Sequence, residues 1–143
     1  LESIGEGVFW NCSSLESISI ENTKITKLPT NTFYGDKKLK EITLPNSVTT
    51  IGDGVFSSCR SLTKIVLSNK VETIGKNFLS GCLLMKTLNI PKSLKSIGDS
   101  CFMISPFDHL DTINYAGTEA EWNSIAKVGS TGYLSSVTIN YLG

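Results

Sequence analysis

A unit of about 23 residues recurs four to five times along the chain, and this repeat constrains the fold more than any other feature. Its frame reads L-x-x-I-x4-F-x-x-C-x-x-L-x-x-I-x-I. The residues of its second slot follow one another at intervals of 23 positions: Leu28, Ile51, Ile74 and Ile97. One such unit is too small to bury its own apolar side chains, so the repetition predicts a solenoid in which neighbouring units share a core.

The I-x-I part of each unit predicts a short β-strand, because alternation sends two apolar side chains inward and the residue between them to solvent. A second extended segment is predicted before Gly52 and Gly75, where glycine suits a tight turn. Stacking at the usual strand spacing of about 4.8 Å then gives two narrow parallel sheets, with the phenylalanine slot capping the core from a short turn or helical bend. The predicted I-x-I strands are Ile18–Ile20, Ile42–Leu44, Ile65–Leu67, Leu88–Ile90 and Ile113–Tyr115.

The repeated pattern extends over residues 1–115 and comprises about five copies. Its first residue, Leu1, already occupies the opening slot of a unit, which favours a fragment of a longer array. We therefore expect an N-terminally truncated solenoid that is monomeric, apart from end-to-end association at its exposed first repeat.

Residues 116–143 depart from the repeat and predict a C-terminal capping segment. Thr118 followed by Glu121 fits the capping box that starts an α-helix. Trp122 then lies on the apolar face of that helix, and a last strand is predicted at Ser136–Tyr141. Such a segment shields the open end of a solenoid from solvent.

Composition excludes two classes of partner. Thirteen basic residues balance thirteen acidic ones, so the chain lacks the positive charge of nucleic-acid-binding proteins and of polybasic membrane-binding segments. No apolar run approaches the roughly 20 residues that span a bilayer. The 40% content of hydrophobic residues is enough to fill a core. We therefore expect a folded protein that neither binds nucleic acid nor inserts into a membrane.

Three cysteines follow the repeat period: Cys12, Cys59 and Cys82. None belongs to a C-x-x-C pair, the spacing that structural zinc sites usually use. The period instead predicts a ladder of buried thiols that pack as small apolar groups, with Cys101 buried at a neighbouring position. A disulfide between Cys59 and Cys82 is the alternative, because adjacent repeats bring their Cα atoms within bonding range.

Candidate catalytic groups are sparse. His109 is the single histidine and lies beside Asp108 in an irregular insertion, Ser105–His109. It has no nucleophile partner, and the chain contains neither a G-x-S-x-G elbow nor a G-x-x-x-x-G-K phosphate loop. We predict a solvated loop histidine, no enzyme activity, no metal site and no cofactor.

The solvent-facing positions of the predicted strands form two columns that run across the repeats. Their residues are mostly small and polar with mixed charge, which suits hydrogen bonding to a protein or glycan, and solenoids commonly bind through extended sheet faces. No aromatic side chain lines the columns, so no platform for stacking a sugar is apparent. The predicted binding residues are Ser17, Ser19, Glu41, Thr43, Lys64, Val66, Thr87, Asn89, Thr112 and Asn114.

The spacing F-x-x-C-x-x-L-x-x-I-x-I between Leu1 and Tyr115 resembles the BspA-like leucine-rich repeat family, although Asp36 occupies one cysteine slot. The segment Tyr115–Trp122 is similar to the Y-x-G-T-x-x-x-W element that often closes such arrays. The resemblance implies a leucine-rich repeat solenoid of short parallel β-strands, turns and short helical bends. It also implies a surface-exposed or secreted protein of mucosa-associated bacteria or parasitic protists, linked to adhesion and without a catalytic motif.

We therefore hypothesise a non-catalytic cell-surface interaction module that contacts a host protein, a matrix component or a neighbouring cell through the two columns. Two alternatives stay open. The array is a passive spacer that projects another domain, or an accessory module that presents substrate to a catalytic domain of a larger secreted enzyme. Flanking sequence discriminates among them: a signal peptide with an anchor favours the first two, and a hydrolase domain favours the third.

Overall fold

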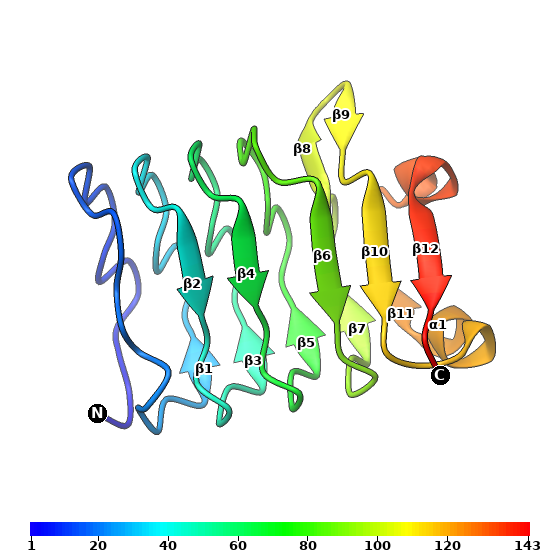
Figure 1. Cartoon of the computed structure of the whole chain (residues 1–143), viewed down its shortest axis with the longest axis horizontal. Coiled ribbons are helices and arrows are strands. Elements are labelled where there is room, and N and C mark those ends of the chain that lie inside the picture. The colour runs from blue at the N-terminus through cyan, green and yellow to red at the C-terminus, as the bar shows by residue number, and fades with distance from the viewer.

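After the first turn, which contains no strand, each turn of the chain places one short strand in each of two opposing walls, so that equivalent residues of successive repeats lie side by side (Figure 1). The computed structural model describes residues 1–143 as a parallel β-solenoid of about five turns. The back wall is one continuous parallel sheet. Its strands, in order, are β1 (Lys27–Leu28), β3 (Thr50–Ile51), β5 (Thr73–Ile74), β7 (Ser96–Ile97) and β11 (Ala126–Lys127).

The front wall carries the predicted columns and is not continuous. β2 pairs with β4, whereas β6, β10 and β12 form a separate three-stranded sheet. The prediction of two parallel sheets is therefore correct for the back wall, but the front wall is interrupted between β4 and β6. The front-wall strands are β2 (Glu41–Thr43), β4 (Lys64–Val66), β6 (Thr87–Ile90), β10 (Thr112–Tyr115) and β12 (Thr138–Tyr141).

Alternating burial along the front-wall strands confirms the predicted I-x-I pattern. In β6, Leu88 and Ile90 are buried, and Asn89 between them is exposed. The predicted strand at Ile18–Ile20 is wrong. Ile20 is buried as expected. However, β2 pairs only with β4, so residues 18–20 have no strand beside them with which to form a hydrogen-bonded ladder.

Aromatic side chains connect the repeats inside the core. Phe9, Phe33 and Phe56 stack with successive ring centroids 5.3 and 5.4 Å apart, and Phe78 meets Phe56 edge-on at 5.5 Å. The last three of these rings are fully buried. Each aromatic pair adds about 0.5–1.5 kcal/mol beyond the apolar area that it buries, so the stack couples each repeat to the next.

Glycines that follow the back-wall strands are required by the close approach of successive repeats. A Cβ atom at Gly75 would lie 2.6 Å from the carbonyl carbon of Gly52, and one at Gly98 would lie 2.4 Å from the amide nitrogen of Lys76. None of these three glycines has a positive φ. Steric clearance, and not a turn conformation reserved for glycine, therefore explains their presence.

The predicted burial of the thiols is confirmed for Cys59, Cys82 and Cys101, which are inaccessible to solvent, but it is wrong for Cys12, which is only half-buried in the first repeat. The thiol of Cys59 donates to the carbonyl oxygen of Phe33 with Sγ and O 3.1 Å apart, and the thiol of Cys82 donates to that of Phe56 at 3.0 Å. Burial raises the pKa of the Cys59 thiol to about 12. The alternative disulfide is wrong, because all four cysteines are free.

Asp36 takes the place of the thiol in the second repeat and is equally buried. Its Oδ1 accepts a hydrogen bond from the backbone N–H of Cys12 at 2.8 Å, whereas its Oδ2 has no partner. Desolvation by burial raises the pKa of Asp36 from 3.8 to about 6, against the opposing effect of the Cys12 hydrogen bond. The second repeat therefore holds a carboxyl group where its neighbours hold thiols.

Residues 116–143 add one more strand to each wall and two short helices. The predicted capping box is present at the start of α1 (Glu119–Ser124). The N–H of Glu121 donates to Oγ1 of Thr118 at 3.2 Å, and the N–H of Thr118 donates to Oε2 of Glu121 at 2.7 Å. A 3-10 helix, η1 (Gly132–Ser136), precedes β12. The function of this segment as a cap stays a prediction.

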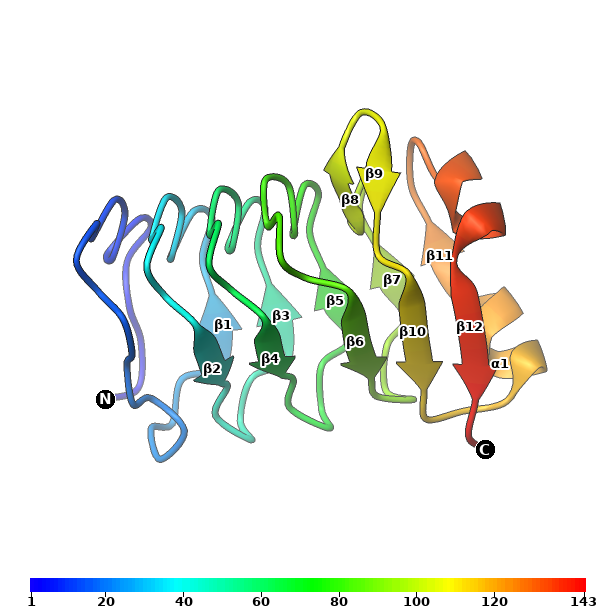
Figure 2. The ribbon, with the colours of Figure 1, turned by 45° about the horizontal axis from the view of Figure 1, so that its top comes forward.

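The irregular insertion forms an antiparallel hairpin, which the sequence did not predict. β8 (Met103–Ser105) pairs with β9 (Asp108–His109), and the hairpin projects beyond the edge of the solenoid (Figure 2). Phe107 at its tip is 98% exposed. His109 is half-buried with its Nδ1 2.7 Å from the carbonyl oxygen of Leu110, so the predicted solvated loop histidine is wrong.

Candidate binding face on the front wall

Strand register aligns the predicted binding residues in two groups, one on each side of the interruption in the front wall. The first group contains Glu41 opposite Lys64 and Thr43 opposite Val66, and the second contains Thr87 opposite Thr112 and Asn89 opposite Asn114. Ser17 and Ser19 are exposed but belong to no strand. The structure thus gathers eight of the ten predicted residues into paired strands, and their participation in binding stays a prediction.

Three asparagines form a hydrogen-bonded ladder across the second group. Nδ2 of Asn140 donates to Oδ1 of Asn114 at 2.8 Å, and Nδ2 of Asn114 donates to Oδ1 of Asn89 at 3.0 Å. Asn140 was missed by the sequence prediction, although a signal for it exists. The sequence Thr-Ile-Asn-Tyr occurs at 112–115 and again at 138–141, and the two copies pair in register as β10 and β12.

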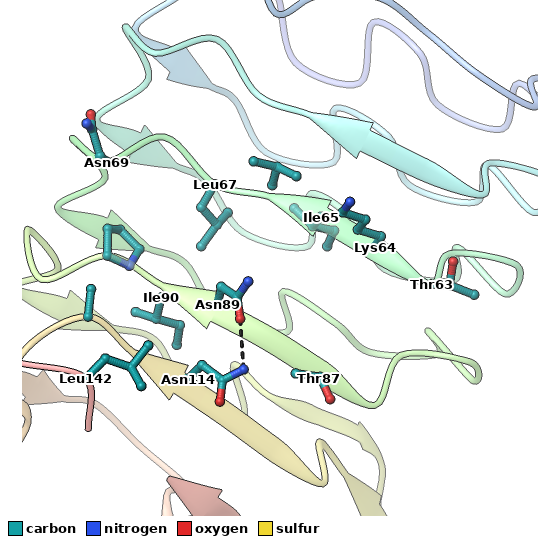
Figure 3. Close-up of a pocket in the computed structure, with 13 residues that line it drawn as sticks. Thr63, Lys64, Ile65, Leu67, Asn69, Thr87, Asn89, Ile90, Asn114 and Leu142 are labelled. Atoms are coloured by element: carbon teal, nitrogen blue, oxygen red, sulfur yellow. Dashed lines mark hydrogen bonds between the residues drawn. The ribbon is translucent and has the colours of Figure 1, made fainter. Parts of the chain in front are cut away.

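A groove of about 560 Å³ opens where the front wall is interrupted (Figure 3). In Figure 3, Leu67 and Asn89 lie between the ribbons of β4 and β6, and a dashed line joins Asn89 to Asn114. Besides Leu67, aliphatic side chains from both sides line the groove. The predicted binding residues that line it are Lys64, Val66, Thr87, Asn89 and Asn114.

The groove combines exposed apolar area with one positive charge. Val66 is 40% exposed and Leu142 is 68% exposed, although both side chains are aliphatic. Lys64 is the one charged residue that lines the groove. It belongs to none of the three ion pairs of the chain, so Glu41 opposite it lies beyond ion-pair distance. The groove can therefore offer a ligand both an apolar surface and a charged hydrogen-bond donor.

The groove offers hydrogen bonding, charge and apolar contact. No three side chains of His, Cys, Asp or Glu anywhere in the chain lie close enough together to hold a metal ion. None of the helices combines the length and the apolar character that a membrane crossing requires.

The repeats match the family model of the BspA type leucine-rich repeat region, in six copies over residues 1–117. The chain belongs to this family. Its leucine-rich repeats account for the strands of both walls up to β10, and the match confirms the fold that the spacing of the phenylalanine, cysteine and isoleucine slots predicted. Among proteins with curated descriptions, none matches the chain.

Solved structures of other proteins share this fold. A leucine-rich cell surface protein of Faecalibacterium prausnitzii A2-165 has a TM-score of 0.62 and 22% identity, covering 77% of this chain and 34% of its own length. A leucine-rich repeat protein of Bacteroides ovatus ATCC 8483 has a TM-score of 0.51 and 24% identity, with coverage of 99% and 53%. The pneumococcal vaccine antigen PcpA has a TM-score of 0.54 and 20% identity, with coverage of 82% and 39%. The BspA-type chain thus spans about a third to a half of each, and the likeness concerns the fold.

Proposed function

We propose that this BspA-type leucine-rich repeat segment is a non-catalytic interaction module of a surface-exposed or secreted protein, and that its front wall binds a protein partner. The groove between β4 and β6 carries the proposal, because predicted binding residues meet solvent-exposed aliphatic side chains there. A contiguous apolar surface rimmed by polar groups is typical of an interaction site. The surface location is supported by the F. prausnitzii protein of the same fold, which is a cell surface protein.

The construction of the two walls favours binding with little loss of conformational entropy. The back wall is paired along its whole length, and the front-wall strands on either side of the groove are each paired with a neighbour. Side chains on such strands are already held at the repeat spacing before a partner arrives. A pre-organised surface loses less free energy on association than a flexible one, so many weak contacts can add up to useful affinity.

Binding of the purified protein to a panel of matrix proteins and glycans, measured by biolayer interferometry, tests the proposal. We expect saturable binding to a protein of the panel that is abolished by the double substitution Thr43→Glu and Asn89→Glu, which adds one charge at Asn89 in the groove and one at Thr43 on β2, the strand that pairs with β4. The matched control is Thr26→Glu with Ala126→Glu, which adds the same charge at exposed positions along the back wall.

The outcomes separate the candidate functions. Loss of binding in the front-wall variant, with the back-wall variant unaffected, supports an interaction module that acts through this face. Equal binding by both variants would place the contact elsewhere on the molecule. Absence of binding to every component favours a passive spacer or a module that presents substrate to an attached enzyme.

A further inference from the structure

We infer that the groove between β4 and β6 binds an extended peptide segment in which a carboxylate side chain stands beside aliphatic residues. This inference rests on the proposed function and names the chemistry that the front wall recognises. It is carried by three properties of the groove: its exposed apolar area, its single cation, Lys64, which forms no ion pair, and the direction of the hydrogen bonds in the asparagine ladder.

The apolar area is concentrated at one part of an otherwise polar face. Val66 stands in a column whose other predicted members are polar, and it lines the groove together with Leu67 and Leu142. Two of these side chains, Val66 and Leu142, are 40% and 68% exposed. A ligand that covers them with its own aliphatic side chains removes apolar surface from water on both partners. The aliphatic component of the inferred ligand follows from this surface.

The charge of the groove is positive although the chain as a whole is neutral. Lys64 projects from β4 and is free of ion pairs, and no acidic side chain lines the groove. The registered neighbour, Glu41, belongs to β2 on the far side of β4 and lies beyond 4 Å from the ammonium group. A ligand carboxylate in the groove would therefore be attracted by Lys64, and no acidic side chain of the groove would repel it.

The side-chain hydrogen bonds of the asparagine ladder all run the same way, and this leaves a hydrogen-bond donor free at the groove. Asn140 donates to Asn114, and Asn114 donates in turn to Asn89, so the Oδ1 of Asn89 is already used as an acceptor. The Nδ2 of Asn89 has no partner within the protein. Asn89 lies at the edge of the interruption (Figure 3), so its free N–H groups can donate to a carboxylate or to a backbone carbonyl. Lys64 and Asn89 thus supply donors from opposite sides.

The shape of the groove favours an extended chain over a compact molecule. Its lining runs along the strands, from Thr63 and Thr87 at one end to Leu142 at the other (Figure 3). A peptide in an extended conformation advances about 3.3 Å per residue and alternates its side chains. Such a segment can place a carboxylate near Lys64 and aliphatic side chains against Val66 and Leu67.

Titration of the isotope-labelled protein with capped pentapeptides, followed by NMR, tests the inference. The probes are Ser-Val-Glu-Leu-Ser, the same peptide with glutamine or lysine at the centre, and acetate alone. We expect the glutamate peptide to shift the amide signals of β4 and β6 and to bind about threefold more tightly than the glutamine peptide, as for an exposed ion pair. The difference should vanish in about 1 M salt, where the Debye length is about 3 Å.

Charge reversal at Lys64 provides the decisive variant. Lys64→Glu should make the lysine peptide the stronger ligand, whereas Lys27→Glu, the same change on the exposed face of the back wall, should leave the preference intact. Equal affinity for all three peptides, signal changes outside the groove, or acetate matching the peptide would each overturn the inference. If matrix-protein binding still depends on the front wall in that case, the proposed function stands while the inferred ligand chemistry falls.

Discussion

Replacing Asp36 by asparagine tests the energetic effect of a carboxyl group in the thiol ladder. Because burial raises its pKa to about 6, the folded protein keeps a proton on Asp36 that the unfolded chain has released above its usual 3.8. The stability that this group contributes is fully present below pH 3.8 and is lost as the pH rises through about 6. Above that range the protein carries an ionised carboxylate without solvent around it.

The magnitude follows from the two pKa values. A tenfold difference in acid strength corresponds to ~1.4 kcal/mol, so ionisation of Asp36 destabilises the fold by about 3 kcal/mol at pH 8. Asparagine retains an oxygen that can accept from the Cys12 N–H and carries no charge. Asp36→Asn should therefore be about 3 kcal/mol more stable than the natural sequence at pH 8 and close to it at pH 3.5.

Urea unfolding followed by circular dichroism at pH values from 3.5 to 8 measures this difference. The gap between the free energies of unfolding of the two proteins should widen between about pH 4 and pH 6 and then stay constant. Glu41→Gln is the matched control, because it removes a carboxylate from an exposed position of β2. A gap that does not change with pH would refute the reasoning, because Asp36 would then have the same pKa in the folded and unfolded states.

Three further predictions concern packing and capping. Gly75→Ala should lower the free energy of unfolding by about 1–3 kcal/mol in urea titrations, because the new methyl group meets the Gly52 backbone. Phe56→Ala should lower it by about 3–5 kcal/mol in the same assay, because it leaves a cavity in the ring stack, whereas Phe107→Ala, at 98% exposure, should stay within about 0.5 kcal/mol of the natural protein. Thr118→Ala should destabilise α1 by about 1 kcal/mol, measured as faster amide hydrogen exchange in its first turn.

Each of these has a result that would contradict it. Unchanged stability in the alanine variant of Gly75 would mean that successive repeats can separate without loss of packing. Equal effects of the substitutions at Phe56 and Phe107 would mean that the ring stack does not couple the repeats. Unchanged exchange in α1 would mean that the cap contributes nothing to the start of that helix.

The core could be predicted from the sequence because its slots demand apolar bulk at fixed intervals. Ile65 and Leu88 occupy equivalent slots, and both are buried as expected. The interruption between β4 and β6 could not be predicted, because these strands are separated by the same 23 positions as the paired strands β2 and β4. Equal spacing determines which residues face inward, but it leaves open whether neighbouring backbones form a ladder.

The columns show why a repeat predicts a scaffold better than a ligand. A middle position such as Val66 faces solvent, so packing places few demands on it and substitutions there leave the repeat recognisable. Departures from the period therefore carry the functional information that the period itself lacks. Two departures meet at the groove: the missing ladder between β4 and β6, and an aliphatic residue in a polar column. The asparagine ladder ends at the same place, which makes this part of the front wall different from every other turn of the solenoid.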